Sequence, residues 1–176
     1  DLSGCGISDI SLLSLCTSLE KLDLGDNSIK DLTPLMDITG LKSLDLENNK
    51  IDDVRPLMGL KKLEYLNLAG NKIDSVTALS YGDGGTGAFE GCVSLKKIAF
   101  SKNLSQIAYH TFRNCSALEY AALPETTVWL GAGAFGNCSS LAALEVLAPD
   151  CRFVSSAAVY ADTTLYGYSG SSAEKF

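Results

Sequence analysis

Basic residues are scarce in this sequence, and their scarcity excludes a large class of functions. Lys and Arg together number 14 against 21 Asp and Glu, so the 176-residue chain carries a formal net charge of −7. Binding to nucleic acid depends on clustered Lys and Arg that neutralise phosphates. The charge balance therefore argues against nucleic acid as a partner.

Long apolar runs, aromatic residues and cysteines are scarce too. No stretch approaches the roughly 18–20 consecutive apolar residues that a membrane-spanning helix needs, so no membrane insertion of this chain is expected. Hydrophobic residues make up 46% of the chain but aromatic residues only 8%, which indicates an interior of Leu, Ile, Val and Ala. Six cysteines are too few for a disulfide-dominated scaffold.

What the sequence does contain is a repeat. Stretches that begin at Leu19, Leu41 and Leu63 share the pattern L-x-x-L-x-L-x-x-N-x-I, and each follows the previous one after 22 residues. A fixed period with this pattern is the signature of leucine-rich repeats. Side chains alternate along each short strand, so two leucines face inward and the residue between them faces solvent. Stacking the repeats as parallel strands buries the leucines, which no single repeat can do alone.

Two further features recur within these repeats. An asparagine column is predicted to satisfy unpaired backbone groups where the chain turns inward, because an amide both donates and accepts. Its members are Asn27, Asn49 and Asn71, and Cys5 occupies the same register. Pro34 and Pro56 predict short 3₁₀ or helical segments on the outer wall, since proline suits a first helical turn.

The first residues lie in the register of this repeat. Asp1-Leu2 corresponds to Asp23-Leu24 in the middle of a predicted strand, and no signal peptide precedes it. The first repeat of a solenoid needs a polar cap. We therefore expect the sequence to be a fragment from which targeting signals have been removed.

The repeat changes character after a glycine-dense junction. A second template, Ala-Phe-x-x-Cys-x-x-Leu, then recurs every 23 residues. The aromatic and cysteine positions that recur are Phe89, Phe112, Phe135, Cys92, Cys115 and Cys138. Departures from the two templates occur at Ala78, Thr111 and Ala121. The strand pattern continues, so we expect the sheet to run through the switch while phenylalanines and cysteines fill the outer layer.

These observations predict one domain with four parts. They are 22-residue repeats over 1–79, a glycine-rich junction over 80–87, 23-residue repeats over 88–150 and a degenerate repeat or cap over 151–176. The expected fold class is α/β: a right-handed leucine-rich-repeat solenoid with short parallel strands on its concave face. Short 3₁₀ or helical turns and loops are expected on the convex face.

Both halves resemble known families. Asn27-x-Ile-x-Asp-Leu-x-Pro-Leu35, with a near copy at 49–57, resembles the 22-residue repeats of internalin-type bacterial surface proteins. Ala88-Phe-x-x-Cys-x-x-Leu95, repeated at 134–141, resembles the BspA-like class of anaerobic and gut bacteria and some parasitic protists. The segment 165–175 is similar to the one that often ends BspA-like arrays. The resemblance implies a secreted or cell-surface protein whose usual role is adhesion to host or matrix proteins.

Three features could suggest chemistry. Gly82-Asp-Gly-Gly-Thr-Gly87 matches the dinucleotide fingerprint G-x-G-x-x-G but lacks the βαβ context, so we interpret it as a flexible junction. His110 is the only histidine, and its neighbour Cys115 belongs to the predicted buried column, which disfavours a nucleophilic pair. The cysteine column allows free thiols, a disulfide between neighbours or a metal site. The 23-residue spacing lacks the close pairs of zinc sites, so free core thiols are favoured.

No catalytic residue, metal ligand or cofactor is therefore predicted, and the candidate site is a surface. Strand alternation places one exposed column at Lys21, Ser43, Tyr65, Lys97, Tyr120 and Ala143, and another at Asp23, Asp45, Asn67, Ala99, Ala122 and Glu145. Acidic side chains give way along these columns to tyrosines, a lysine and small alanines. Exposed tyrosine is enriched at protein-binding hot spots. The candidate ligand-binding residues are Tyr65, Asn67, Lys97, Tyr120, Asp23 and Asp45.

The repeats thus predict a non-enzymatic module that binds a protein through the concave sheet. The family resemblance implies that it is part of a secreted or cell-surface bacterial protein that adheres to a host or matrix protein. The acids at Asp23 and Asp45 also have a simpler interpretation, because any strand needs polar residues on its wet side. Two alternative functions stay open. One is carbohydrate binding, for which Trp129 and Tyr120 are the aromatic candidates, and the other is a structural spacer within a larger protein.

Overall fold

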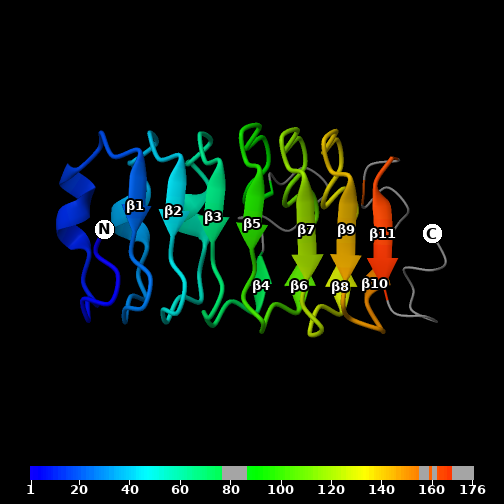
Figure 1. The fold of residues 1–176 in the computed structure, drawn as a ribbon, viewed down its shortest axis with the longest axis horizontal. Coiled ribbons are helices and arrows are strands. Elements are labelled where there is room, and N and C mark those ends of the chain that lie inside the picture. Colours follow the sequence, from blue (N-terminus) through cyan, green and yellow to red (C-terminus); the bar gives the residue numbers. More distant parts are fainter. Residues whose placement is uncertain (77–86, 155–158, 160–161, 168–176) are drawn as a thin grey trace.

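A parallel sheet of seven strands dominates the computed structural model, which describes residues 1–76, 87–154, 159 and 162–167. The strands stand side by side along the molecule, as Figure 1 shows. In order they are β1 (Lys21–Asp23), β2 (Ser43–Asp45), β3 (Tyr65–Asn67), β5 (Lys97–Ala99), β7 (Tyr120–Leu123), β9 (Ala143–Val146) and β11 (Thr164–Gly167). We call this the long sheet. It confirms the predicted leucine-rich-repeat solenoid, which has about six turns.

The long sheet continues without a break across the change of repeat. Strand β3 pairs directly with β5, and Tyr65 lies opposite Lys97. The step between these two partners is 32 residues, against 22 between Ser43 and Tyr65. Ala78 and most of the glycine-rich junction lie in the segment 77–86, which is outside the described residues. The prediction that the sheet runs through the switch is confirmed.

The outer wall differs between the two halves. In the first half it consists of the 3₁₀ turns η1 (Ser11–Leu15), η2 (Thr33–Leu35) and η3 (Arg55–Leu57). Pro34 and Pro56 are the second residues of η2 and η3 and thus lie in their first turns, as expected from the fixed φ of proline.

A second parallel sheet, which the sequence did not predict, forms the outer wall from the last 22-residue repeat onward. Its strands are β4 (Ser75–Val76), β6 (Gln106–Ile107), β8 (Trp129–Leu130) and β10 (Arg152–Phe153). The inward residues Val76, Ile107 and Leu130 are buried, whereas Ser75, Gln106, Trp129 and Arg152 form an outer row. Each strand is only two residues long, which is too short to give a periodic signal in the sequence.

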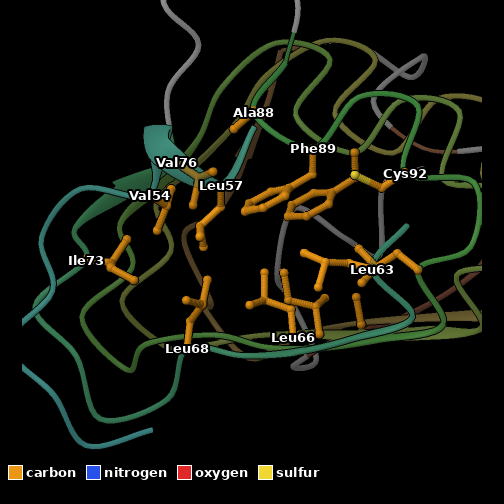
Figure 2. Close-up of a cluster of buried hydrophobic side chains, with 14 of the residues drawn as sticks. Val54, Leu57, Leu63, Leu66, Leu68, Ile73, Val76, Ala88, Phe89 and Cys92 are labelled. Carbon is orange, nitrogen blue, oxygen red and sulfur yellow. The ribbon is translucent and has the colours of Figure 1, made fainter. Parts of the chain in front are cut away.

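One continuous core lies between the two walls. In Figure 2, Leu66 of β3 and Leu68, which follows this strand, point toward the same interior as Val76 and Phe89. The three repeat phenylalanines form a stack: ring centroids lie 5.4 Å apart for Phe89 and Phe112, and 5.1 Å apart for Phe112 and Phe135. All three side chains are fully buried. The prediction that phenylalanines fill the outer layer of the second half is confirmed.

The asparagine column makes the backbone contacts that the sequence predicted. Asn49 Oδ1 accepts a hydrogen bond from the backbone N–H of Ile29 at 2.9 Å, and its Nδ2 donates to the carbonyls of Leu24 and Leu46. Asn27 and Asn71 repeat the same contacts one turn away. After the switch Ser101 takes over, and its buried hydroxyl donates to the carbonyl of Asn71 at 2.8 Å.

Candidate functional site

The exposed face of the long sheet carries the two predicted columns, extended by one strand. We call it the sheet face. Its first column runs Lys21, Ser43, Tyr65, Lys97, Tyr120, Ala143 and Thr164; its second runs Asp23, Asp45, Asn67, Ala99, Ala122, Glu145 and Tyr166. Parallel strands lie about 4.8 Å apart, so the columns span about 30 Å. The strand alternation that placed these residues on one face is therefore correct.

The first three residues of the second column close the turn that leaves each strand. Asp23 Oδ1 accepts a hydrogen bond from the backbone N–H of Gly25 at 3.0 Å. Asp45 Oδ1 does the same for Glu47 at 2.9 Å, and Asn67 Oδ1 for Ala69 at 3.1 Å. Asp and Asn side chains commonly bond the backbone two residues on. The local turn therefore already accounts for the acids at Asp23 and Asp45.

Asn67 lies on the predicted face but is not exposed, which corrects one expectation. Only 7% of its surface is accessible, because the carboxylates of the preceding turn cover it. Its Nδ2 donates to Asp45 Oδ2 and to Glu47 Oε2, each at 3.1 Å. Asn67 thus positions two acidic side chains and offers little surface of its own to a ligand.

The two tyrosines of the first column are held by carboxylates of the second. The Tyr65 hydroxyl donates to Asp45 Oδ2 at 3.3 Å, and the Tyr120 hydroxyl donates to Glu145 Oε2. The pKa of Tyr65 is raised by burial and by the charge of Asp45, and the pKa of Tyr120 by its hydrogen bond to Glu145 and then by burial. Both phenols are therefore uncharged at neutral pH. Tyr65 leans toward the amino-terminal repeats and Tyr120 toward the carboxy-terminal ones.

Lys97 stands between the tyrosines on β5. It is exposed, and it makes no ion pair with any residue that the structure describes. The neighbouring positions in the second column are the small side chains Ala99 and Ala122. At the centre of the sheet face, the exposed Lys97 therefore lies beside the small side chains of the second column, with a tyrosine ring on either side.

Tyr166 is the residue that sequence reasoning missed. It pairs with Glu145 in β11, and 57% of its surface is exposed. The alternation in Thr164-Leu-Tyr-Gly167 contained the signal, but the step from Ala143 to Thr164 is 21 residues instead of 23. The shortened repeat hid the register.

Comparison with known proteins agrees with this geometry. The family described as "BspA type Leucine rich repeat region (6 copies)" matches residues 72–165, more than half of the chain. The chain belongs to the BspA-type leucine-rich-repeat family. A second leucine-rich-repeat family, described by two copies, matches residues 1–35 and 39–81. The two-part recognition from the sequence is confirmed.

Solved structures similar to this BspA-type protein include two internalins from Listeria monocytogenes. Internalin C2 shares 22% sequence identity with a TM-score of 0.52, and the match covers 93% of this chain and 76% of the internalin. For the internalin inlF the identity is 18% and the TM-score 0.45, with 96% of this chain and 59% of the internalin covered. The BspA-type chain thus spans less than two thirds of inlF. Among curated proteins, none matches the sequence.

Leucine-rich-repeat families of this kind are in general non-enzymatic protein-interaction modules. Within the described ranges, no helix is long and apolar enough to cross a membrane, and no three His, Cys, Asp or Glu side chains are grouped to hold a metal ion. His110 and Cys115 do not form an exposed pair, because Cys115 is fully buried.

The cysteine column of the BspA-type repeats is part of the core, as predicted. Cys92, Cys115 and Cys138 are fully buried, and the last two donate through Sγ to the carbonyls of Phe89 and Phe112 at 3.2 and 3.1 Å. Burial raises the pKa of all three thiols, that of Cys138 to about 11. Such thiols react slowly because the thiolate is the nucleophile.

We expect native protein to react quickly with a thiol reagent at two positions only, Cys5 and Cys16, whose side chains are exposed. The buried column should react slowly, and denaturation without reductant should release at least its three thiols. The measurement is a time course with a chromogenic disulfide at pH 8. Oxidation of all three column cysteines in the denatured, unreduced protein would contradict the prediction of free core thiols.

Proposed function

We propose that the sheet face binds a protein, and that the parent molecule is a secreted or surface-exposed bacterial protein that adheres to a host or matrix protein. The observation that carries the proposal is the centre of the first column, where Tyr65, Lys97 and Tyr120 stand on three neighbouring strands. Tyrosine is over-represented among the residues that dominate binding energy at interfaces. Relatives with these repeats are typically surface or secreted bacterial proteins, which supports the setting.

The tyrosines are suited to binding because they are already held in place. Each hydroxyl bonds a carboxylate, Asp45 for Tyr65 and Glu145 for Tyr120. A side chain that is ordered before binding loses little conformational entropy when a partner covers it. The rings sit on short strands of a stacked sheet, so their backbone positions are fixed as well.

The charges on the sheet face favour a partner that carries both acidic and basic side chains. Lys97 makes no ion pair with a described residue, so it is available to a carboxylate of the partner. Asp23 and Asp45 end β1 and β2, Glu47 lies in the turn after β2, and all three attract basic groups. Flanking charges of this kind mainly increase the association rate. We therefore assign the rings and Lys97 to contact and the acids to steering.

Tyr65→Ala and Tyr120→Ala are expected to weaken binding by about 1–2 kcal/mol or more each, because hot-spot rings contribute most of the interface energy. Binding is measured by surface plasmon resonance against immobilised laminin, fibronectin and collagen and against proteins recovered in a matrix pull-down. Tyr120→Phe separates the ring from its hydroxyl: it keeps the aromatic surface and loses only the bond to Glu145.

Arg55→Glu serves as the control on the outer wall, where the exposed Arg55 of η3 pairs with Asp53. Binding by this variant should equal that of the wild type. If both alanine variants bind normally while Arg55→Glu abolishes binding, the partner uses the outer wall and the proposal is wrong.

Asp23→Asn tests steering without disturbing the turn, since an asparagine oxygen can accept the same hydrogen bond from Gly25. The association rate should fall and depend less on salt, while the dissociation rate stays unchanged. A faster dissociation would instead place Asp23 in direct contact with the partner.

A further inference from the structure

The second sheet carries a hollow on its outer side. The hollow has a volume of about 580 Å³ and is lined by Gln106, Val128, Trp129, Asp150 and Arg152. Three of these side chains, Gln106, Trp129 and Arg152, are the outer row of β6, β8 and β10, in direct register. Small-molecule sites typically have volumes of roughly 300–1,000 Å³ and combine aromatic surface with a few polar groups. The size and composition of the hollow are of that kind.

Trp129 forms the aromatic surface of the hollow and is fixed in place. Its ring contacts Tyr109 edge to face, with ring centroids 5.3 Å apart and planes inclined by 79°. Edge-to-face contacts are the favoured geometry of aromatic pairs. Trp129 is half-buried and stands on a strand, so it offers a rigid aromatic surface beside the exposed Val128.

The polar side chains around Trp129 are not engaged by the part of the chain that the structure describes. Gln106, Asp150 and Arg152 make no side-chain hydrogen bond or ion pair with another described residue. This differs from the sheet face, where Asp23, Asp45, Asn67 and Glu145 are all bonded within the protein. Gln106 both donates and accepts, Asp150 accepts and Arg152 donates. One acid and one base together leave the lining without net charge.

We infer that this hollow binds a neutral carbohydrate. A pyranose has a face of C–H groups, which packs on the negative face of an aromatic ring such as Trp129. Its rim of hydroxyls donates and accepts, which matches the mixed set of Gln106, Asp150 and Arg152. An anionic sugar would meet Asp150 and a protein of net charge −7, so the uncharged class fits better.

The site is separate from the sheet face and goes beyond the proposed function. Val76 of β4 and Leu66 of β3 point into one core from the two sheets, as Figure 2 shows. The outer residues of the two sheets therefore face away from that core in different directions. Trp129 and Tyr120, the two aromatic candidates for sugar binding, cannot line one site.

Trp129 is the only tryptophan of the chain, so its fluorescence reports from this hollow alone. The experiment titrates the protein with cellotetraose, mannotetraose and N-acetylchitotetraose up to about 10 mM, a range that covers weak binding. At least one neutral sugar should change the emission saturably, and calorimetry should give the same affinity. A sulfated heparin tetrasaccharide should leave the emission unchanged.

Three variants decide the location. Gln106→Ala and Arg152→Ala truncate exposed side chains and should weaken sugar binding about tenfold or more, equivalent to about 1.4 kcal/mol. Trp129→Ala should abolish heat of binding, with its fold checked by circular dichroism because the ring is half-buried. Tyr120→Ala, on the other sheet, should bind the sugar like the wild type.

The inference is overturned if no neutral sugar changes the emission, or if the change persists in the Gln106→Ala, Arg152→Ala double variant. It is also overturned if Tyr120→Ala removes sugar binding. A matrix protein that alters Trp129 emission when no sugar does would assign the hollow to a protein contact instead. Each of these results leaves the test of Tyr65 and Tyr120 on the sheet face unaffected.

Discussion

Phe112→Ala is expected to lower the free energy of unfolding by about 3–5 kcal/mol, through the lost apolar contacts and the cavity that remains. Phe112 is the middle ring of the stack, fully buried, with Phe89 on one face and Phe135 on the other. Phe100 packs edge-on against it, with ring centroids 5.7 Å apart. These three aromatic neighbours are fixed on the repeats before and after that of Phe112, so they cannot close the gap together. Urea denaturation followed by circular dichroism measures the change.

The matched control is Val93→Ala, which lies in the same kind of turn but is 55% exposed. Its effect should stay within about 0.5 kcal/mol. A loss below 1 kcal/mol for Phe112→Ala would mean that the phenylalanine column is not part of the core.

Asn49→Ala is the second substitution with a large expected effect, about 2–4 kcal/mol, although it removes no apolar group. The side chain accepts a hydrogen bond from the N–H of Ile29 and donates to the carbonyls of Leu24 and Leu46, and all three bonds are buried. Each buried polar group left without a partner costs about 1–3 kcal/mol. Alanine satisfies none of them, and the position is too enclosed for bulk water to replace the amide, since only 6% of Asn49 is exposed.

Asn103→Ala provides the comparison. Asn103 is exposed, and among the described residues only its backbone N–H is hydrogen-bonded, to Ser101 Oγ. This variant should be nearly as stable as the wild type. Equal losses of stability for Asn49→Ala and Asn103→Ala would show that a residue of the asparagine column contributes no more than an ordinary surface residue.

The long sheet and its core were predictable because many positions repeat one register. Leu22, Leu44 and Leu66 each alternate with a polar residue, and the fixed spacing extends this local signal through the stack. The same arithmetic placed Tyr65, Lys97 and Tyr120 on one face. A period that recurs is read reliably even where a single strand has only three residues.

The second sheet and the state of Asn67 were not predictable, for two different reasons. Strands such as Trp129–Leu130 are too short for their alternation to be distinguished from a loop. Asn67 occupies a position that points to solvent, but Asp45 and Glu47 from the preceding repeat cover it. Burial by side chains of another repeat is a tertiary effect, and strand alternation reports only the direction of the Cβ.

Thr111 shows how a departure from the repeat is accommodated. Its template position is alanine, and it is completely buried. The hydroxyl donates toward the carbonyls of Ala108 at 2.8 Å and Val76 at 3.3 Å. A buried hydroxyl with a partner carries little penalty, so the substitution keeps the core intact.

The stacked phenylalanines also bear on how such a protein can evolve. Cys115 bonds the carbonyl of Phe89 just as Cys138 bonds that of Phe112, and the rings repeat the same contact. Because one junction between 23-residue units is chemically equivalent to the next, duplicating or deleting a unit creates no unfamiliar packing. Copy number can then drift by recombination within the gene, each step lengthening or shortening the ribbon by about 4.8 Å. The distance between Tyr65 and Glu145 is then a heritable property that selection can change in steps of one repeat.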